Sequence, residues 1–395
     1  MTDFNALLTI LSVPRANGSR ALRATCLALC NWLSERDIRY RLQKIRYFPF
    51  YFEALGAGLL ISQAVLALAV WSGWGLTTLL TAAVTLVLAV AEGVGWSPLS
   101  KVRLGPGTNI VIELPVPNAT QELVLSAHYD SKTELLDHVR RTVLFRYLPL
   151  GLVVTFVMGL IGVIYWQVPT VPPAFHVSLD AFGRLLTIPQ LLLMGGLGVN
   201  FAFGRLTEQS SGAVDNGAAC AILLALAERI DHNVHPLQQT SVTICLFTGE
   251  EALAQGSSAY VQSRTWPLDT VALNLEIMGQ NGDYLLAEKL ASPLRSYPVP
   301  AWLNTAIDSD ITNLTGRTVH RQALPIVTDS VPFLKAGIAA TTLFSLDQTH
   351  GAGGMHRPTD SVERVNIERL DEAVTLLLAV AQHYDHGLGF RLGLD

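Results

Sequence analysis

The chain has 395 residues, of which 50% are hydrophobic and 15% are charged, and its formal net charge is −5. A typical soluble domain carries about 25% charged residues, so this composition excludes a disordered protein, a collagen-like protein and a wholly soluble enzyme. The acidic balance gives no indication of nucleic acid as a partner, because that function usually needs a basic surface. The four cysteines show neither CxxC spacing nor a framework of pairs, which favours a reducing compartment.

The charge deficit lies in two segments, residues 52–100 and 147–204. They hold 107 residues but only four charged ones, whereas the other 288 residues carry 55 of the 59 charges. We therefore expect a globular domain that is interrupted by two apolar insertions. The expected boundaries are 1–48, 101–146 and 205–395 for the globular domain, and 49–100 and 147–204 for the insertions.

The N-terminal part of the chain begins with an apolar run at residues 1–14. No basic stretch precedes this run and no convincing cleavage site follows it, so no cleavable signal peptide is expected. Residues 21–35 have the periodicity of an amphipathic helix, and residues 38–45 and 109–114 have the pattern of strands. The first apolar insertion therefore separates two predicted strands.

Each apolar insertion is long enough for two membrane-spanning helices. Residues 52–71 and 75–96 form the first pair and residues 147–166 and 185–203 the second, with a proline-containing loop expected at 167–183. A stretch of about 20 apolar residues crosses roughly 30 Å of hydrocarbon, and tryptophans stand at several segment ends, as they do at membrane interfaces. The sequence therefore predicts an integral membrane protein with four spans; four buried helices of a large soluble fold are the alternative.

Basic residues flank the apolar insertions unequally. The flanks on the globular side contain ten of them, whereas the opposite side contains only Arg184. The ten are Arg39, Arg41, Lys44, Arg46, Lys101, Arg103, Arg140, Arg141, Arg146 and Arg205. Because cytoplasmic loops are richer in lysine and arginine, both termini and the globular domain are expected in the cytoplasm.

After the first insertion, apolar strands alternate with helices. Strands are expected at residues 122–127, 241–247, 272–277 and 340–344, and helices at 214–230, 257–264, 329–336 and 366–383. The stretch between the strand at 272–277 and the helix at 329–336 has no clear pattern and is expected to be irregular. The alternation predicts an α/β fold with a sheet that helices cover on both faces.

Polar residues follow three of these strands. His128 and Asp130 come directly after ELVLSA, Glu250 and Glu251 follow SVTICLF, and Glu276 stands near the end of ALNLEI. In open α/β sheets, ligands bind at the carboxyl ends of the strands. These side chains are therefore expected to meet at one edge of the sheet.

Asp215 and His356 extend this set of residues. Asp215 precedes the apolar helix AACAILLALA, and His356 lies in the glycine-rich loop GAGGMHRPTD. Taken singly, Asp215 suits a helix N-cap, paired glutamates suit a helix start, and a strand-end histidine is more often structural than a ligand. Together, two imidazoles and several carboxylates predict a divalent-metal site for zinc or a similar ion.

With these residues in this order, the sequence resembles the zinc-dependent aminopeptidase family, peptidase family M28, which includes bacterial leucyl aminopeptidases, glutamate carboxypeptidase and glutaminyl cyclases. The resemblance covers nearly all residues outside the apolar insertions. It implies the mixed, mostly parallel sheet of the zinc exopeptidases, a phosphorylase/hydrolase-like α/β fold. The motifs are PRANGS at 14–19, HYDS at 128–131, VDNGAA at 214–219, GEE at 249–251, NLE at 274–276, TDSVPFLKAGI at 328–338 and HRPTDS at 356–361.

The resemblance also implies a centre with two zinc ions and five protein ligands. Asp215 would bind both ions. One ion would also bind His128 and Glu276, and the other Glu251 and His356. The implied activity is that of a membrane-anchored aminopeptidase that hydrolyses the N-terminal bond of peptide substrates.

Two further residues have implied roles beside the ligands. Asp130 would orient the ring of His128, and Glu250 would be the general base that removes a proton from water. Glutamate at 276 departs from many soluble members, which have aspartate there, but resembles membrane-bound endoplasmic-reticulum and vacuolar members. The separation of 85 residues between Asp130 and Asp215 is a second departure, because the second apolar insertion falls between them.

Several other functions remain as alternatives. A non-catalytic membrane receptor or scaffold on the peptidase fold is one, and a carboxypeptidase or deacylase on the same site is another. A glutaminyl cyclase is disfavoured because that branch of the family works with a single zinc. A transporter is disfavoured because the spans contain only Glu53 and Glu92, both near segment ends. The sequence predicts neither the preferred substrate residue nor the oligomeric state.

Overall fold

In the computed structural model the chain forms two compact units. The sheet unit contains Met1–Pro49, Ser100–Thr133 and Glu208–Asp395, and the helical unit contains Phe50–Leu99 and Glu134–Thr207. The structure describes residues 2–167, 172–207, 209–231, 237–267, 269–292, 294–347 and 353–387.

The sheet unit is built on a sheet that has nine strands among the described residues. The strands lie in the order β1-β2-β4-β3-β5-β9-β6-β7, with β8 beside β6. The central strands β4, β3, β5 and β9 are parallel, whereas β1, β2, β6 and β7 form antiparallel pairs. This mixed sheet with a parallel centre confirms the predicted fold class. The strands are Tyr40–Tyr47 (β1), Gly105–Leu114 (β2), Gln121–His128 (β3), Thr240–Phe247 (β4), Thr270–Glu276 (β5), Tyr284–Ser292 (β6), Arg295–Pro298 (β7), Val319–Leu324 (β8) and Ala339–Ser345 (β9).

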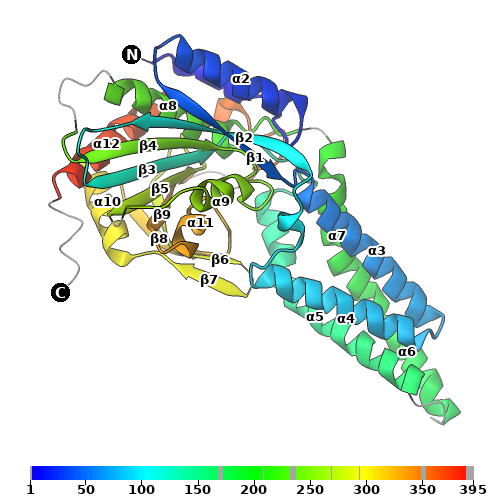
Figure 1. Ribbon diagram of the computed structural model, residues 1–395. Coiled ribbons are helices and arrows are strands. Elements are labelled where there is room, and N and C mark those ends of the chain that lie inside the picture. Colours follow the sequence, from blue (N-terminus) through cyan, green and yellow to red (C-terminus); the bar gives the residue numbers. More distant parts are fainter. Residues whose placement is uncertain are drawn as a thin grey trace. The chain divides into compact units, whose positions relative to one another are not determined.

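Helices cover both faces of this sheet. In Figure 1, α2, α8 and α12 lie on one face, and α9 and α11 lie on the other. Three of the described helices begin at side chains that cap them: Asp3 accepts a hydrogen bond from the amide of Ala6, Ser19 from that of Leu22 and Asn366 from that of Glu368. The helices are Phe4–Leu11 (α1), Arg20–Ser34 (α2), Ala218–Asp231 (α8), Gln255–Gln262 (α9), Ala301–Thr315 (α10), Ser330–Lys335 (α11) and Ile367–Asp385 (α12).

Alternating apolar residues of the central strands hold these layers together. In β4, Val242, Ile244 and Leu246 belong to the core cluster that includes α8 and α12. Cys245 and Phe247 belong to the cluster on the other face, with residues of α9 and α11. Because successive strand residues point to opposite faces, β4 is buried on both sides, and the carboxyl end of each parallel strand is fixed in position.

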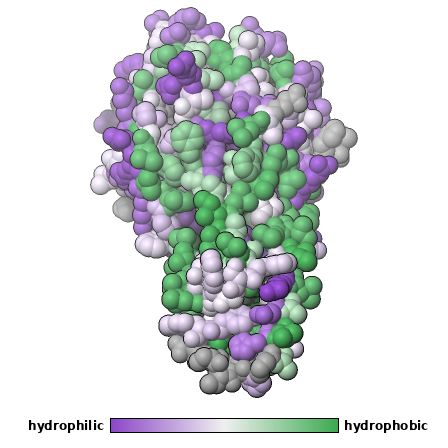
Figure 2. Space-filling model, turned by 90° about the vertical axis from the view of Figure 1, so that its right-hand side faces the viewer, coloured by the Kyte–Doolittle hydropathy of each residue, from purple (hydrophilic) through white to green (hydrophobic). Residues whose placement is uncertain are grey.

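The helical unit consists of apolar helices that satisfy, by length and composition alone, the requirements of four membrane spans. The fourth span, Ala174–Leu206, combines α6, a π-helical turn at Leu191–Gly195 and α7. On the visible surface of these helices, broad hydrophobic areas lie beside a paler strip and a few hydrophilic residues (Figure 2). The helices are Tyr51–Trp71 (α3), Gly75–Gly93 (α4), His138–Gln167 (α5), Pro173–Gln190 (α6) and Gly196–Phe203 (α7).

Glycines allow these helices to approach closely. A Cβ atom added to Gly56 of α3 would lie 2.7 Å from the carbonyl oxygen of Gly198 in α7. A Cβ atom added to Gly75 of α4 would lie 2.7 Å from the carbonyl oxygen of Gly162 in α5. Contacts between small residues are typical of helices that pack within membranes.

The charged residues of the apolar segments have partners inside the helical unit. Glu53 forms an ion pair with Arg205, and Glu92 accepts a hydrogen bond from Tyr51. Asp180 accepts one from Tyr165, and the guanidinium of Arg184 donates to the carbonyl of Trp71 at 3.4 Å. Such pairing lowers the free-energy cost of placing charged groups near hydrocarbon.

Several elements differ from the expectations. The third apolar helix begins at His138 rather than at residue 147. The loop expected at 167–183 is wrong for most of its length, because α6 is helical from Pro173; proline is favoured at the first helical position. Residues 168–171 lie outside the described part of the chain. The stretch expected to be irregular contains β6, β7, α10 and β8, and α1 forms where only an apolar run was noted.

Candidate metal centre

The strand ends bring three of the predicted groups together. His128 is the last residue of β3 and Glu276 the last of β5, and these strands are neighbours in the sheet. Glu250 and Glu251 follow β4, the neighbour of β3 on its other side. The carboxyl ends of parallel neighbours meet at one edge. The imidazole Nε2 of His128 consequently lies 3.3 Å from Oε2 of Glu276.

Asp215 reaches the same edge from an irregular segment before α8. The segment Ala213–Gly217 is not regular helix: Asp215 is extended, with φ −115° and ψ 86°, and its bond to Asn216 is cis. Gly212 has φ +63°, and a Cβ atom there would lie 2.6 Å from Cβ of Ser131. A larger residue at 212 would therefore be strained and would clash. The predicted helix at 214–230 begins at Ala218, so Asp215 is free to turn toward the sheet edge.

His356 completes the set from the loop that follows β9. It has a positive φ of 64° and is nearly buried. Its Nε2 atom lies 2.9 Å from Oε1 of Glu251 and 3.2 Å from Oδ2 of Asp215. The structure thus brings together all five residues that the sequence indicated as ligands.

The five residues form two groups of three that share Asp215. One group is His128, Asp215 and Glu276, and the other is Asp215, Glu251 and His356; within each, the potential ligand atoms lie within 4.8 Å of one another. Oδ1 of Asp215 faces His128 at 3.3 Å, whereas Oδ2 faces His356. Buried imidazole nitrogens and carboxylate oxygens are a donor set for zinc and similar ions. The residues therefore fit divalent cations.

Burial of so many acidic groups leaves the centre short of positive charge. Burial raises the pKa of Glu250 well above its ordinary value, and the nearby carboxylates of Glu276 and Glu251 add to the rise. Burial also raises the pKa of Glu276. Burial would also raise the pKa of Asp215, but its hydrogen bonds with the imidazoles of His128 and His356 hold that pKa well below the ordinary range. Cations at this position would relieve the repulsion among the carboxylates.

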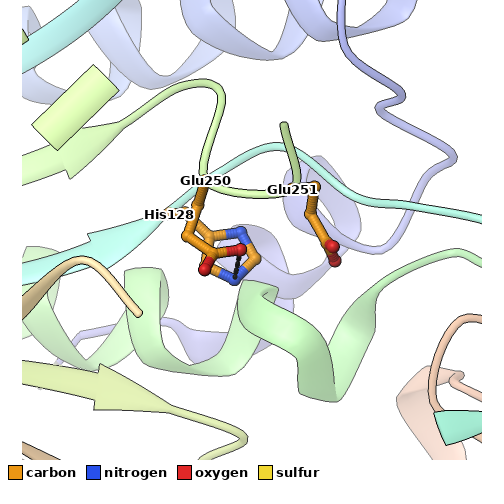
Figure 3. Close-up of side chains that lie close together, drawn as sticks. All are labelled: His128, Glu250 and Glu251. Atoms are coloured by element: carbon orange, nitrogen blue, oxygen red, sulfur yellow. Dashed lines mark ion pairs between the residues drawn. The ribbon is translucent and has the colours of Figure 1, made fainter. Parts of the chain in front are cut away.

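Glu250 belongs to neither of the groups that share Asp215, but its carboxylate forms a third group of potential ligands with His128 and Glu251. Figure 3 shows its side chain directed toward the ring of His128, while that of Glu251 lies to one side. Oε2 of Glu250 lies 3.8 Å from Nε2 of His128. The two adjacent glutamates can therefore take different roles, because their side chains leave the loop in different directions.

Asp130 makes contacts that the sequence did not predict. Its carboxylate accepts hydrogen bonds from the amides of Glu250 at 3.3 Å and Glu251 at 3.0 Å, and from Nδ2 of Asn17 at 2.7 Å. Nδ1 of His128 lies 3.1 Å from the backbone oxygen of Asp130 but 3.8 Å from its carboxylate. The carboxylate of Asp130 therefore supports the glutamate loop more directly than it supports the histidine ring.

Two asparagines that sequence reasoning missed hold Glu276. Nδ2 of Asn274 donates to Oε1 of Glu276 at 3.1 Å, and Nδ2 of Asn216 donates to Oε2 at 3.0 Å. Ser126 in turn donates to Oδ1 of Asn274. Asn216 follows Asp215 in the motif VDNGAA, and Asn274 lies two residues before Glu276 in NLE. An asparagine this close to a predicted ligand was the one sign in the sequence that could have indicated these contacts.

The fold is shared with solved structures of a zinc aminopeptidase, a Zn-dependent exopeptidase and a glutaminyl cyclase. A zinc aminopeptidase from Bacillus subtilis superposes with a TM-score of 0.55 at 14% sequence identity, covering 97% of this chain and 94% of that one. A Zn-dependent exopeptidase from Parabacteroides distasonis gives 0.53 at 13% identity, covering 96% and 98%. Glutaminyl cyclase from Porphyromonas gingivalis also gives 0.53 at 13% identity, covering 97% and 98%. A sequence search of curated proteins gives no match.

The sequence also matches a family model directly. The description of that model is peptidase family M28, and the match covers residues 198–381. This range runs from α7 into α12 and includes four of the five residues that the two donor groups comprise, the exception being His128. The match covers a little under half of the chain, and it supports the resemblance to peptidase family M28 that the sequence motifs indicated.

Proposed function

We propose that the protein is a membrane-anchored, metal-dependent aminopeptidase with a dinuclear zinc site. The observation that carries the proposal is the pair of donor groups that share Asp215, with Glu250 beside them. In this proposal one ion is held by His128, Glu276 and Asp215, and the other by Glu251, His356 and Asp215. Bound zinc supplies Lewis acidity, which polarises a carbonyl group and makes water more acidic.

Glu250 is the proposed general base. It is largely buried, its pKa is raised by burial, and its carboxylate faces the space beside both donor groups. A carboxylate in this position accepts a proton from the attacking water and returns it to the amine of the leaving peptide. The hydrogen bond from its amide to Asp130 fixes the start of its side chain, so the proton acceptor is held in place before substrate binds.

The first experiment combines metal analysis with substrate profiling of the full chain in detergent. We expect about two zinc ions per chain, hydrolysis of aminoacyl fluorophores, loss of activity with a chelator and recovery on adding zinc. Activity only on N-blocked or C-terminal substrates would favour a carboxypeptidase or deacylase. Cyclisation of N-terminal glutamine would favour a glutaminyl cyclase, and a chain without bound zinc or activity would favour a scaffold.

The membrane assignment is part of the same proposal. The lengths and composition of the four apolar helices, the exposed hydrophobic side chains and the paired charges support it. Exposed large residues of this kind include Ile61, Leu68, Leu80, Val84, Val87, Val153, Phe156, Leu185 and Leu192. In water these side chains would lie against solvent at a cost of about 25 cal/mol per Å² of apolar surface. We expect the chain to stay with membranes after alkaline extraction; release into the soluble fraction would contradict the assignment.

A further inference from the structure

The N-terminal segment that contains Arg15 and Asn17 runs along the strand end that carries His128 and Asp130. The amide of Arg15 donates to Oγ of Ser131 at 2.8 Å, and the amide of Ser131 donates to the carbonyl of Arg15 at 3.1 Å. Ala16 and Ser131 form a parallel bridge. The segment therefore extends the sheet locally, next to the metal centre and more than a hundred residues away in sequence.

Arg15 ties two loops of the centre together through their backbone. It is fully buried, and its guanidinium donates to the carbonyl of Tyr129 at 2.8 Å. It also donates to the carbonyls of Ser211 at 2.7 Å and Gly212 at 3.0 Å. Tyr129 lies between His128 and Asp130, and Gly212 precedes Asp215 by three residues. The N-terminal segment is thus attached to both loops.

Asn17 contacts Asp130, which in turn holds the loop that contains Glu250 and Glu251. Its side chain is 2% exposed, and Nδ2 donates to Oδ2 of Asp130 at 2.7 Å. The hydroxyl of Tyr47 accepts from the amide of Gly18 at 3.2 Å and donates to Oδ1 of Asn17 at 2.9 Å. This contact fixes the orientation of the amide, because a flipped amide would set its oxygen against the Asp130 carboxylate.

The hydrogen bonds continue from Asp130 to the glutamates. Its carboxylate accepts from the amides of Glu250 and Glu251, which adjoin each other at the end of β4. A shift or rotation of this carboxylate would move both amides and hence both side chains. The direction of the Asp130 carboxylate is set in turn by Asn17 and Tyr47.

We propose that Asn17 is a positioning residue of the metal centre. By holding the carboxylate of Asp130, it sets the backbone of Glu250 and Glu251 and so the places of the general base and of one metal ligand. The inference rests on the proposed function for the roles of these two glutamates. Asn17 itself touches neither the donor groups of the metal ions nor the reacting atoms.

The test compares Asn17 with a buried asparagine elsewhere in the sheet unit. Asn304 is also 2% exposed, donates to the carbonyl of Ala287 at 2.9 Å and accepts from Thr341 at 2.8 Å. Asn17→Ala removes the donor to Asp130, and Asn17→Asp keeps the shape but places a second carboxylate against it. Asn304→Ala removes a similar pair of hydrogen bonds outside the centre. All are measured on the full chain in detergent.

Three measurements separate positioning from general loss of stability. We expect both Asn17 variants to lower zinc affinity and kcat by about 10- to 100-fold, with KM little changed. We also expect a changed absorption spectrum of the cobalt-substituted chain. Asn304→Ala should lower Tm by a similar amount but leave zinc affinity, the cobalt spectrum and kcat as in the wild type.

Zinc affinity is measured by competition with a chelator and needs no peptide substrate. The positioning role of Asn17 can therefore be tested separately from the proposed aminopeptidase activity. If the wild type binds zinc but cleaves no aminoacyl substrate, the activity assignment fails while a loss of zinc affinity in Asn17→Asp still supports positioning. If both Asn17 variants match Asn304→Ala in zinc affinity and cobalt spectrum, the inference is wrong. Should neither Asn17 variant fold, Tyr47→Phe decides: a smaller loss in the same direction supports the inference, and no change overturns it.

Discussion

At the scale of single residues, Asp215 joins the two donor groups because each of its oxygens faces a different imidazole. Oδ1 lies 3.3 Å from His128 and Oδ2 lies 3.2 Å from His356. Its position depends on Gly212, which adopts a positive φ without strain, and on the amide of Val214, which donates to Oδ1 of Asp360 at 2.8 Å. The ligand set is therefore held by backbone contacts as well as by the ligands themselves.

The most direct residue-level prediction concerns the base. Glu250→Gln keeps the size and shape of the side chain but removes the proton acceptor, so we expect kcat to fall by about 10²- to 10⁴-fold. Zinc content should stay as in the wild type, because the proposed ligands of both ions exclude Glu250; a loss of zinc would instead assign Glu250 to the third group of potential ligands, with His128 and Glu251. Glu368→Gln, on the exposed start of α12, is the control and should keep full activity. A fully active Glu250→Gln enzyme would show that another residue is the base.

A second prediction concerns the length of the ligand at 276. Glu276 is held at both oxygens, by Asn274 and Asn216, while Oε2 also faces His128. Glu276→Asp shortens the side chain by one methylene, so these three contacts cannot all be kept. We expect zinc affinity to fall by about 10- to 100-fold with Tm of the metal-free chain little changed. Unchanged zinc affinity in a chelator competition assay would show that the site adapts to aspartate.

At the scale of elements, the strands at the parallel centre of the sheet were predictable from their apolar runs, whereas β6, β7 and β8 were not. β3, β4, β5 and β9 are apolar runs that are buried on both faces, and each was expected within one or two residues of its observed bounds. β8, with the sequence VHRQAL, is a half-exposed outer strand with three consecutive polar residues. Apolar and polar residues do not alternate in it, so its sequence gives no strand signal. It forms a strand because it pairs with β6.

The site was predictable to a similar degree. The proposed ligands are chemically distinctive residues at strand ends and in adjoining loops, so their order and spacing were enough to predict that they come together. The support of the site was not predictable, because Asn17 contacts Asp130 across 113 positions of sequence and is a common polar residue in a loop. Contacts of this kind depend on how the chain returns to the sheet edge, which no local pattern encodes.

One element-level prediction concerns Asp385, at the end of α12. Its side chain holds the segment that leads into β4. Its carboxylate accepts from the amides of Gln238, Gln239 and Thr240 at 2.7 to 2.9 Å. Burial alone would raise the pKa of Asp385, but these hydrogen bonds hold it below the ordinary value of 3.8. Because the folded state favours the ionised form, the stabilisation is complete above the ordinary value and is lost as pH falls through the folded pKa.

Asp385→Asn should therefore destabilise the chain by about 2 kcal/mol near neutral pH. The difference from the wild type should narrow as the pH falls below about 4. Asp371→Asn on the same helix removes only a half-exposed ion pair with Arg229 and should cost less than about 0.5 kcal/mol. Thermal unfolding of all three chains between pH 3 and 7 measures both effects. An Asp385→Asn deficit that is constant with pH would contradict the electrostatic explanation.

At the scale of the whole molecule, the chain alternates between two chemically different units. The chain leaves the sheet unit after Pro49 and after Thr133, and it returns at Ser100 and at Glu208. Each excursion carries two of the four apolar helices long enough to span a membrane. An even number of spans in each excursion returns the chain to the side from which it left. In the proposed membrane topology the three parts of the sheet unit would therefore lie on one side of the membrane, together with both termini.

Which side that is follows from the basic residues and gives the last prediction. Ten lysines and arginines flank the proposed spans on the side of the sheet unit, against Arg184 alone on the other, so we expect the sheet unit in the cytoplasm. Gly73, in the turn between α3 and α4, is a suitable insertion point because no heavy atom of the other described residues, its two chain neighbours aside, lies within 4 Å of a Cβ placed there. Alkaline phosphatase, which is active only outside the cytoplasm, should be active at residue 73 and inactive after the C-terminus. Green fluorescent protein at the two positions should give the reverse result. Phosphatase activity at the C-terminus, with none at residue 73, would mean that the charge rule fails and that the metal centre faces the exterior.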